Sequence, residues 1–84
     1  MTQVTIYTKP YCPYCIRAVD LLEKKGVAFT EIEAAFDAEK RQEMMRRSGR
    51  ATFPQIFVGD RHIGGCDDMM ALEREGKLDP LLAA

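Results

Sequence analysis

The sequence of 84 residues lacks an excess of charge of either sign. With 12 basic and 13 acidic residues, its formal net charge is −1, and so small an imbalance creates no field that would attract nucleic acid or an anionic membrane. It also lacks any apolar run near the ~20 residues of a membrane span, and residues 1–4 do not open a basic segment followed by an apolar core. We therefore expect a cytoplasmic protein with no nucleic-acid or membrane partner.

Internal repeats, linkers and low-complexity segments are absent as well. A chain of this length can bury one hydrophobic core but not two, so we expect a single domain over residues 1–84. The chain has three cysteines, an odd number with two of them close together. That pattern does not fit the paired disulfide framework of a small secreted domain.

Two cysteines separated by two residues lie at the start of a predicted helix. Residues 4–8 are rich in β-branched and aromatic side chains and predict a strand just before them. After Cys12, apolar residues recur at i, i+4 and i+7 counted from Cys15, and Gly26 provides a stop. Pro13 suits the first turn of such a helix. We therefore expect Cys12 at the helix N-terminus and Cys15 further into the helix.

This placement gives the two thiols different chemistry. A thiolate at a helix N-terminus is stabilised by the positive end of the helix dipole and by unpaired backbone N–H groups, so Cys12 should ionise more readily than a free thiol. Lys9 adds a nearby cation. Cys15 lies on the apolar face of the helix, where we expect it to be less exposed and less ionised. Cys12 is then the nucleophile, and Cys15 is the resolving thiol that attacks a mixed disulfide formed at Cys12.

The rest of the chain predicts one more strand and helix, then a hairpin and a last helix. A strand, a helix and a strand in so short a span suggest a βαβ unit with parallel strands. The second helix has only a thin apolar stripe, formed by Ala38, Met44 and Met45. Residues 78–82 are apolar enough to pack on the rest of the domain. The predicted elements are a strand at 27–33, a helix at 37–47 with Asp37 as N-cap, strands at 55–58 and 61–63 joined by a Gly59-Asp60 turn, and a helix that Asp67 or Asp68 caps and Gly76 ends.

Pro54 stands directly before the third strand. Since proline cannot donate to a strand ladder, this position is an edge or the lip of a loop. If the Phe53–Pro54 bond is cis, the backbone of Phe53 turns outward and can offer its N–H and C=O to an extended, peptide-like ligand beside the cysteines. The residues alone leave the isomer open, and only about one X–Pro bond in twenty is cis in folded proteins.

Three motifs in this order resemble the dithiol glutaredoxins, most closely the small bacterial form. They are Cys12-Pro13-Tyr14-Cys15, Thr52-Phe53-Pro54 and Gly64-Gly65-Cys66-Asp67-Asp68. The resemblance implies an α/β thioredoxin-like fold, with a four-stranded mixed sheet flanked by three helices and a cis Phe53–Pro54 bond. It also implies a glutathione-dependent oxidoreductase that reduces protein–glutathione mixed disulfides and protein disulfides. Glutathione would be a co-substrate, with no tightly bound cofactor, and ribonucleotide reductase is a candidate client.

The resemblance further implies a glutathione site. Lys9 and Arg41 would reach the glycine carboxylate of glutathione, and Tyr14 would form a wall of the groove. Phe53, where the family commonly has Val, would clamp the cysteinyl part with its backbone, and Thr52 and Pro54 flank it. At the γ-glutamyl end, Cys66 and Asp67 would bind the carboxylate through backbone N–H groups at a helix start, and the Asp67 side chain would bind the ammonium. Gly65, with Gly64, would let the backbone approach the ligand closely.

Two alternatives remain open at this level. Cys12, Cys15, His62 and Cys66 have the types and number of ligands of a structural zinc site, although His62 is better explained as a surface residue. Glutaredoxin relatives can also bridge an iron–sulfur cluster between two subunits through the first cysteine and glutathione, which Pro13 and a second active-site cysteine disfavour. We expect a monomer, with a dimer through Cys66 as the other possibility.

Overall fold

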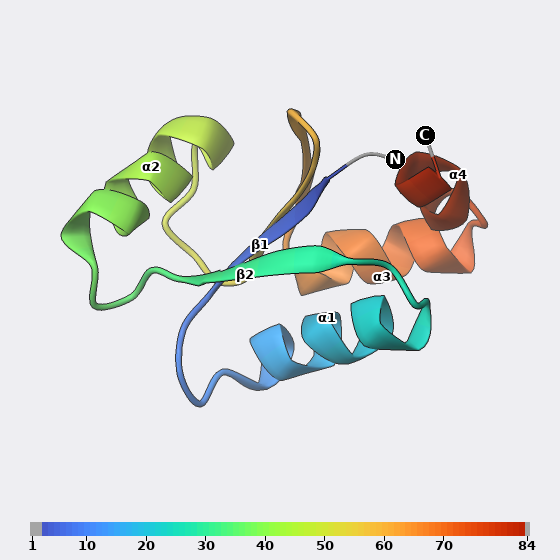
Figure 1. Ribbon diagram of the computed structural model, residues 1–84, viewed down its shortest axis with the longest axis horizontal. Helices are drawn as coiled ribbons and strands as arrows, with labels where there is room; N and C mark the ends of the chain where they lie inside the picture. Colours follow the sequence, from blue (N-terminus) through green and yellow to red (C-terminus); the bar gives the residue numbers. More distant parts are fainter. Residues whose placement is uncertain (1–2, 84) are drawn as a thin grey trace.

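A computed structural model describes residues 3–83 of the chain. Its elements are β1 (Val4–Thr8), α1 (Pro13–Lys24), β2 (Phe29–Glu33), α2 (Ala38–Ser48), β3 (Gln55–Val58), β4 (Arg61–Gly64), α3 (Cys66–Arg74) and α4 (Leu78–Ala83), as Figure 1 shows. The predicted order of elements is confirmed, but the number of helices is four instead of three, because the apolar tail forms α4. No helix within the described residues is long and apolar enough to cross a membrane.

The four strands form one mixed sheet with β1 inside it. The strand order is β2-β1-β3-β4, with β1 parallel to β2 and antiparallel to β3, and with β3 antiparallel to β4. All five residues of β1 are buried, because helices cover both faces of the sheet at this strand. Successive side chains of a strand point to opposite faces, so Val4 and Ile6 join one core cluster and Tyr7 joins another.

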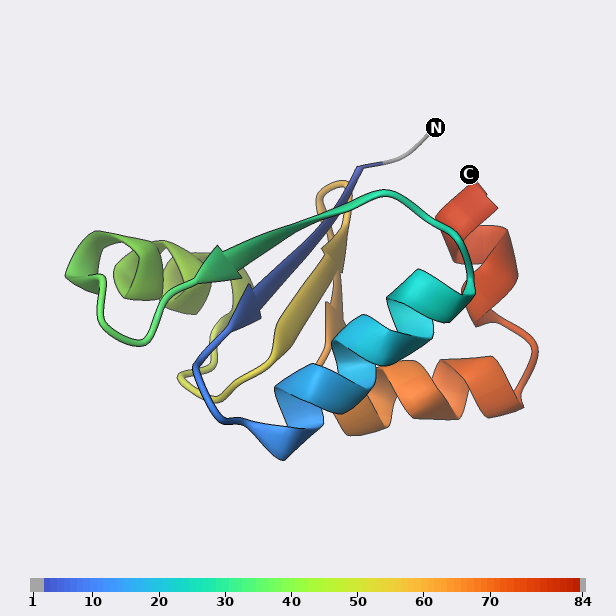
Figure 2. The ribbon, with the colours of Figure 1, turned by 60° about the horizontal axis from the view of Figure 1, so that its bottom comes forward.

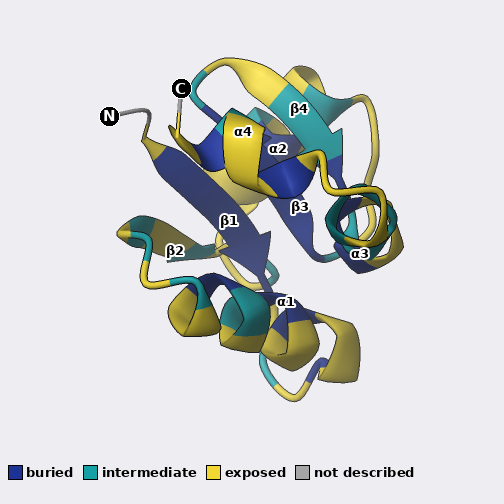
Figure 3. Cartoon of the chain, turned by 90° about the vertical axis from the view of Figure 1, so that its right-hand side faces the viewer, coloured by how far each residue is buried: buried dark blue, intermediate teal, exposed yellow. Residues whose placement is uncertain are grey.

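The larger core lies between the sheet and the helices α1, α3 and α4. Figures 1 and 2 place α1 and α3 side by side on one side of the sheet, with α2 apart from them. Figure 3 shows β1 buried along its length, whereas α1 carries both buried and exposed residues. The side chains that form this core are Val4, Ile6, Ala18, Leu22, Ile56, Val58, Cys66, Met69, Leu78 and Leu82. The helix that carries the two cysteines is therefore fixed along one whole face.

Helix α2 covers the other face through a smaller contact. Of the predicted apolar stripe only Met44 is buried, whereas Ala38 is exposed and Met45 is 42% exposed, so that prediction is wrong for Ala38 and Met45. Polar contacts add to the packing, because the buried Tyr7 hydroxyl donates to Glu43 and accepts from Arg47 Nη1 at 2.8 Å. The Arg47 guanidinium also lies 4.1 Å from the centroid of the Phe57 ring, a cation–π geometry.

Several predicted boundaries are confirmed and two are corrected. Asp37 caps α2 by accepting from the Lys40 N–H at 3.1 Å, and Gly49 ends that helix in the left-handed conformation. The β2 strand is shorter than predicted and begins at Phe29. Helix α3 begins at Cys66 with Gly65 as its N-cap, so neither Asp67 nor Asp68 has that role. Asp68 instead occupies the third helical position, where a carboxylate can accept from the N-cap N–H, here Gly65 N at 2.9 Å.

Candidate active site

Cys12 is the N-cap residue of α1, directly after the loop that leaves the buried strand β1. Its backbone is extended, Pro13 follows in the first turn, and its Sγ accepts a hydrogen bond from the Cys15 N–H at 3.3 Å. The preceding residue, Tyr11, has a φ of 57° and is 98% exposed. A non-glycine residue in this left-handed region is uncommon, and here it turns the chain from the strand into the helix. The predicted helix start at Cys12 is thus confirmed.

Cys15 lies one turn further on and differs from Cys12 in its environment. Burial, followed by the hydrogen bond to Cys12, raises the pKa of the Cys15 thiol to about 12. It is therefore a protonated thiol at neutral pH, which agrees with its predicted weak ionisation. The expectation that Cys15 is the less exposed of the two is wrong, because both residues are 3% exposed. In the described chain all three cysteines are free and buried.

A groove of about 210 Å³ lies between the loop before β3 and the start of α3. We call it the α3 groove. Its lining brings together seven residues of the predicted glutathione site and adds Arg50 and Asp68, which the prediction did not include. The lining residues are Tyr14, Arg50, Thr52, Phe53, Pro54, Gly65, Cys66, Asp67 and Asp68.

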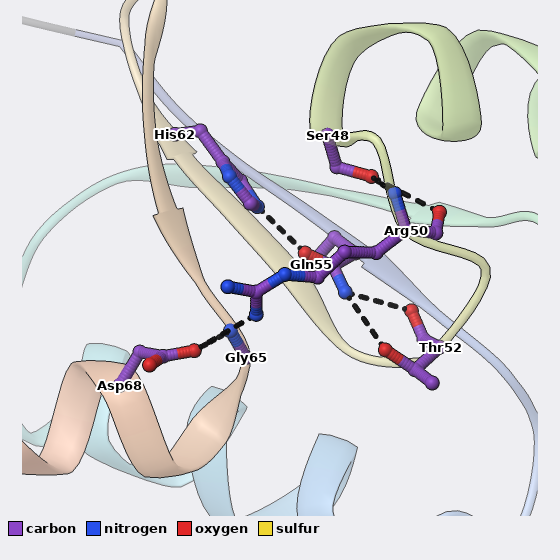
Figure 4. A network of polar contacts seen from close by, with 7 residues as sticks. All are labelled: Ser48, Arg50, Thr52, Gln55, His62, Gly65 and Asp68. Atoms are coloured by element: carbon purple, nitrogen blue, oxygen red, sulfur yellow. Dashed lines mark hydrogen bonds and ion pairs between the residues drawn. The ribbon is translucent and has the colours of Figure 1, made fainter.

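One wall of the α3 groove is the loop around the cis peptide bond of Phe53–Pro54, which confirms the implied isomer. Gln55 holds this loop from behind, because its Nε2 donates to the carbonyl and the hydroxyl of Thr52 at 3.0 and 3.1 Å. His62 Nε2 lies 2.7 Å from Gln55 Oε1, as Figure 4 shows. His62 is thus a half-buried support that also packs on Phe57, with 5.0 Å between the ring centroids, and the prediction of a surface role is corrected.

The other wall includes Gly65, which follows Gly64 at the end of β4. Gly64 has a φ of +119°, and a Cβ placed there would lie 2.7 Å from Cγ and 2.9 Å from Cβ of Asp68. A Cβ on Gly65 would lie 3.4 Å from the Pro54 carbonyl oxygen of the opposite wall. Glycine therefore allows two close approaches here, one of the Asp68 side chain to β4 and one between the two walls.

Two predicted residues lie outside the lining of the α3 groove. Lys9 lines a separate cavity of about 310 Å³ that also reaches Cys15 and Tyr11. Arg41, in the first half of α2, donates from Nη1 to the Ala35 carbonyl at 3.3 Å. The structure thus brings the residues predicted for the cysteinyl and γ-glutamyl parts into one groove, but Lys9 and Arg41 do not line it.

Cys66 is the third cysteine of the chain and lines the α3 groove. It is the first residue of α3 and is 3% exposed. Burial raises the pKa of its thiol, Arg17 lowers it, and the charges of Asp67 and Cys12 raise it further.

The four-ligand zinc alternative is not assembled within residues 3–83. No group of three or more His, Cys, Asp or Glu side chains there has an arrangement that could hold a metal ion. His62, which that alternative requires, is directed at Gln55 instead.

A cysteine pair at a helix start, beside a cis-proline loop on a four-stranded mixed sheet, defines a thiol–disulfide oxidoreductase of the thioredoxin-like class. Within that class, residues 4–63 match the glutaredoxin family, and the chain belongs to this family. Glutaredoxin 3 of Escherichia coli strain K12 is 58% identical over 82 residues, which are 98% of this chain and 99% of that protein.

Two solved structures support the same assignment. The solution structure of glutaredoxin from Brucella melitensis is 62% identical, with a TM-score of 0.85 over 98% of this chain and 89% of the other. The crystal structure of a buckwheat glutaredoxin–glutathione complex is 33% identical, with a TM-score of 0.87 over 98% of this chain and 77% of the other. The implied fold is confirmed, and the protein is a glutathione-dependent thiol–disulfide oxidoreductase.

Proposed function

We propose that this glutaredoxin reduces protein–glutathione mixed disulfides through Cys12 alone, and protein disulfides through Cys12 and Cys15 together. The observation that carries the proposal is the position of Cys12 as N-cap of α1, with a protonated Cys15 one turn behind it. Backbone N–H groups at the helix N-terminus can hydrogen-bond the Cys12 sulfur, whereas burial raises the pKa of the Cys15 thiol to about 12.

In the one-thiol reaction, the Cys12 thiolate attacks the glutathione sulfur of the mixed disulfide. A bond forms between Cys12 Sγ and that sulfur, and the bond to the client sulfur breaks, so the client leaves as a thiolate that takes a proton from water. The thiolate of a second glutathione then attacks the glutathione sulfur on Cys12. Oxidised glutathione leaves and the Cys12 thiolate is restored.

In the two-thiol reaction, the Cys12 thiolate attacks one sulfur of a client disulfide. The client S–S bond breaks, its other sulfur leaves as a thiolate that takes a proton from water, and a mixed disulfide joins Cys12 to the client. Cys15 gives its proton to water and attacks Cys12 Sγ, the bond between Cys12 and the client sulfur breaks, and the second client thiolate leaves as the Cys12–Cys15 disulfide closes. Two glutathione molecules reduce that disulfide and leave as oxidised glutathione. The Cys15 N–H donates to Cys12 Sγ, so the two residues already lie in contact before the attack.

The glutathione moiety is proposed to bind along the α3 groove. The Phe53 backbone holds its cysteinyl part, between Thr52 and Pro54 on one side and Tyr14 on the other. Its γ-glutamyl carboxylate meets the N–H groups of Cys66 and Asp67, because a helix N-terminus is a ready anion site. The Asp67 side chain takes the ammonium group.

The glycine end of glutathione is proposed to leave the α3 groove toward Lys9 and Arg41. Both are exposed cations on the loop before α1 and on α2 respectively, and an exposed cation can pair with a carboxylate at modest strength. Because neither residue lines the α3 groove, this contact requires the glycine end to extend beyond it. Glutathionylated or disulfide-containing proteins in the cytoplasm are the proposed clients, with ribonucleotide reductase as a candidate.

Comparison of Cys12→Ser with Cys15→Ser on two substrates tests the proposed mechanism. The substrates are a glutathionylated peptide and a protein with one exposed disulfide, each assayed with glutathione and coupled to glutathione reductase. Cys12→Ser should lose both reactions, whereas Cys15→Ser should keep reduction of the glutathionylated peptide and lose reduction of the protein disulfide. Loss of both reactions in Cys15→Ser would refute the one-thiol mechanism.

A further inference from the structure

A buried amide stands directly behind the loop that carries the cis bond. Gln55 is the first residue of β3 and is 0% exposed, and a buried amide requires hydrogen-bond partners for both its nitrogen and its oxygen. Its Nε2 donates to the carbonyl and the hydroxyl oxygen of Thr52. Within residues 3–83, the hydrogen-bond partner of its Oε1 is His62 Nε2, at 2.7 Å. Figure 4 shows these contacts running from His62 through Gln55 to Thr52.

The contacts with Thr52 determine which nitrogen of His62 carries a proton. A carbonyl oxygen only accepts hydrogen bonds, so the amide nitrogen of Gln55 must face Thr52 and the amide oxygen must face His62. An amide oxygen also only accepts, and His62 Nε2 must therefore be protonated. Burial, followed by the charge of Arg50, lowers the pKa of His62 against the opposing charge of Asp68. His62 is thus a neutral imidazole at neutral pH, and its one N–H points at Gln55.

The sheet fixes the position of this donor. His62 pairs with Phe57 between β4 and β3, and its ring packs on the buried Phe57 ring with 5.0 Å between the centroids. The donor therefore belongs to the paired strands, whereas the amide that accepts from it leads to the loop.

The same contacts orient the peptide bond between Thr52 and Phe53. This bond is trans, and in a planar trans peptide the C=O and the N–H point in opposite directions. Because the Thr52 carbonyl accepts from Gln55, the Phe53 N–H points away from Gln55. Thr52 and Phe53 both line the α3 groove, so the orientation of this peptide bond determines what the wall of the groove offers to a ligand.

We propose that His62 is a positioning residue for the reduction of glutathione mixed disulfides. Its Nε2–H fixes the amide of Gln55, Gln55 holds the carbonyl of Thr52, and the Phe53 N–H is thereby held toward a ligand in the α3 groove. This inference rests on the proposed binding of glutathione in that groove. Because this chain of contacts ends at the wall of the groove and not at Cys12, it should affect the binding of the substrate and not the chemical step.

The proton assignment can be measured directly, since His62 is the one histidine of the chain. Long-range proton–nitrogen correlation spectra of the imidazole should show a proton on Nε2 and none on Nδ1 at neutral pH. A proton on Nδ1 with an unprotonated Nε2 would overturn the inference, whether or not glutathione binds in the groove.

The kinetic test uses single turnovers of the Cys15→Ser protein with a glutathionylated peptide. Release of the peptide thiol gives the half-saturating concentration and the maximal rate. His62→Phe keeps a ring against Phe57 and removes the donor, so the half-saturating concentration should rise about fivefold, the effect of one net hydrogen bond, with the maximal rate unchanged. His62→Gln keeps an N–H donor and should retain most of the affinity. Gly76→Ala places an alanine at a positive φ of 72° outside these contacts; it is the control for a general loss of stability and should keep the parent's half-saturating concentration.

A double substitution shows whether His62 acts through Gln55. In a Gln55→Met background the acceptor is gone, so His62→Phe should cause no further rise in the half-saturating concentration. A rise of about fivefold in that background as well would overturn the inference. A lower maximal rate in His62→Phe, or a half-saturating concentration equal to that of the parent, would also overturn it. If the parent reduced the peptide without saturating, the proposed glutathione site would fail, and this inference with it.

Discussion

Gly64→Ala should destabilise the protein, because an alanine at this position would clash with Asp68. At a φ of +119° an added Cβ would lie 2.7 Å from Cγ and 2.9 Å from Cβ of Asp68. Real Cβ atoms do not approach so closely, and the carboxylate alone cannot swing away, since the Cβ of Asp68 is itself in conflict. The Asp68 side chain must therefore leave its place, and with it the hydrogen bond to Gly65 and the ion pair with Arg50.

The expected cost follows from these losses. An alanine held at positive φ costs roughly 1–2 kcal/mol. The lost acceptor at the start of α3 costs about 1 kcal/mol, and the half-exposed ion pair contributes at most about 1 kcal/mol. The free energy of unfolding should fall by about 3 kcal/mol in total. That is a large share of the roughly 5–15 kcal/mol of a native domain.

Urea unfolding followed by circular dichroism measures this change, and Gly76→Ala is the matched control. Gly76 also has a positive φ, 72°, but an added Cβ there meets nothing within 4 Å among the described residues. Gly76→Ala should therefore lose only the backbone cost of roughly 1–2 kcal/mol, and it should retain the affinity for a glutathionylated peptide that Gly64→Ala loses. Equal losses of stability in the two variants would refute the reasoning about Asp68.

Two further predictions concern protonation. Because Cys15 has a pKa of about 12, the rate at which it displaces glutathione from Cys12 should rise about tenfold per pH unit between about pH 7 and 9. Stopped-flow assays measure this rate, and the control Cys15→Ser should release no glutathione from Cys12. A rate that does not change with pH would mean that Cys15 is already ionised. Lys25 Nζ lies 2.6 Å from Asp79 and 2.7 Å from Glu73, and these hydrogen bonds raise its pKa above the usual 10.5. Lys25 therefore holds its proton more tightly in the folded protein than in the unfolded chain. The stabilisation of the fold by these ion pairs is fully present below pH 10.5 and is lost as the pH rises through the folded-state pKa. The difference in melting temperature between wild type and Lys25→Met should shrink in alkali, and a constant difference would contradict this.

The parts of the fold that the sequence predicted depend on local chemistry. Pro13 and the N-cap Cys12 define the start of α1 within one turn of chain. The Asp37 side chain likewise bonds a backbone N–H three residues away, and the Gly59-Asp60 turn links strands whose pairing at Val58 and Arg61 follows from its length. Each signal lies within a few residues of the feature it sets, so no knowledge of the fold is needed to use it.

The features that the sequence did not predict depend on residues that meet only in the folded chain. Arg50 and Asp68 are 18 positions apart, and the residues next to each of them in the sequence do not predict that the two side chains meet. The burial of His62 has no signal in its own neighbourhood, because its contact with Gln55 requires β3 and β4 to be paired. For Met44 and Met45, the thin apolar stripe of α2 did not fix which side of the helix faces the sheet.

The most direct test of the account is to identify the covalent intermediate. The Cys15→Ser protein is mixed with a glutathionylated peptide in the absence of free glutathione, quenched with acid, digested and mapped by mass spectrometry. Attack by Cys12 predicts one glutathionyl group per chain, carried by the peptide that contains Cys12. A glutathionyl group on the peptide that contains Cys66, or none on the protein while the client thiol is released, would contradict the assignment of Cys12 as the nucleophile.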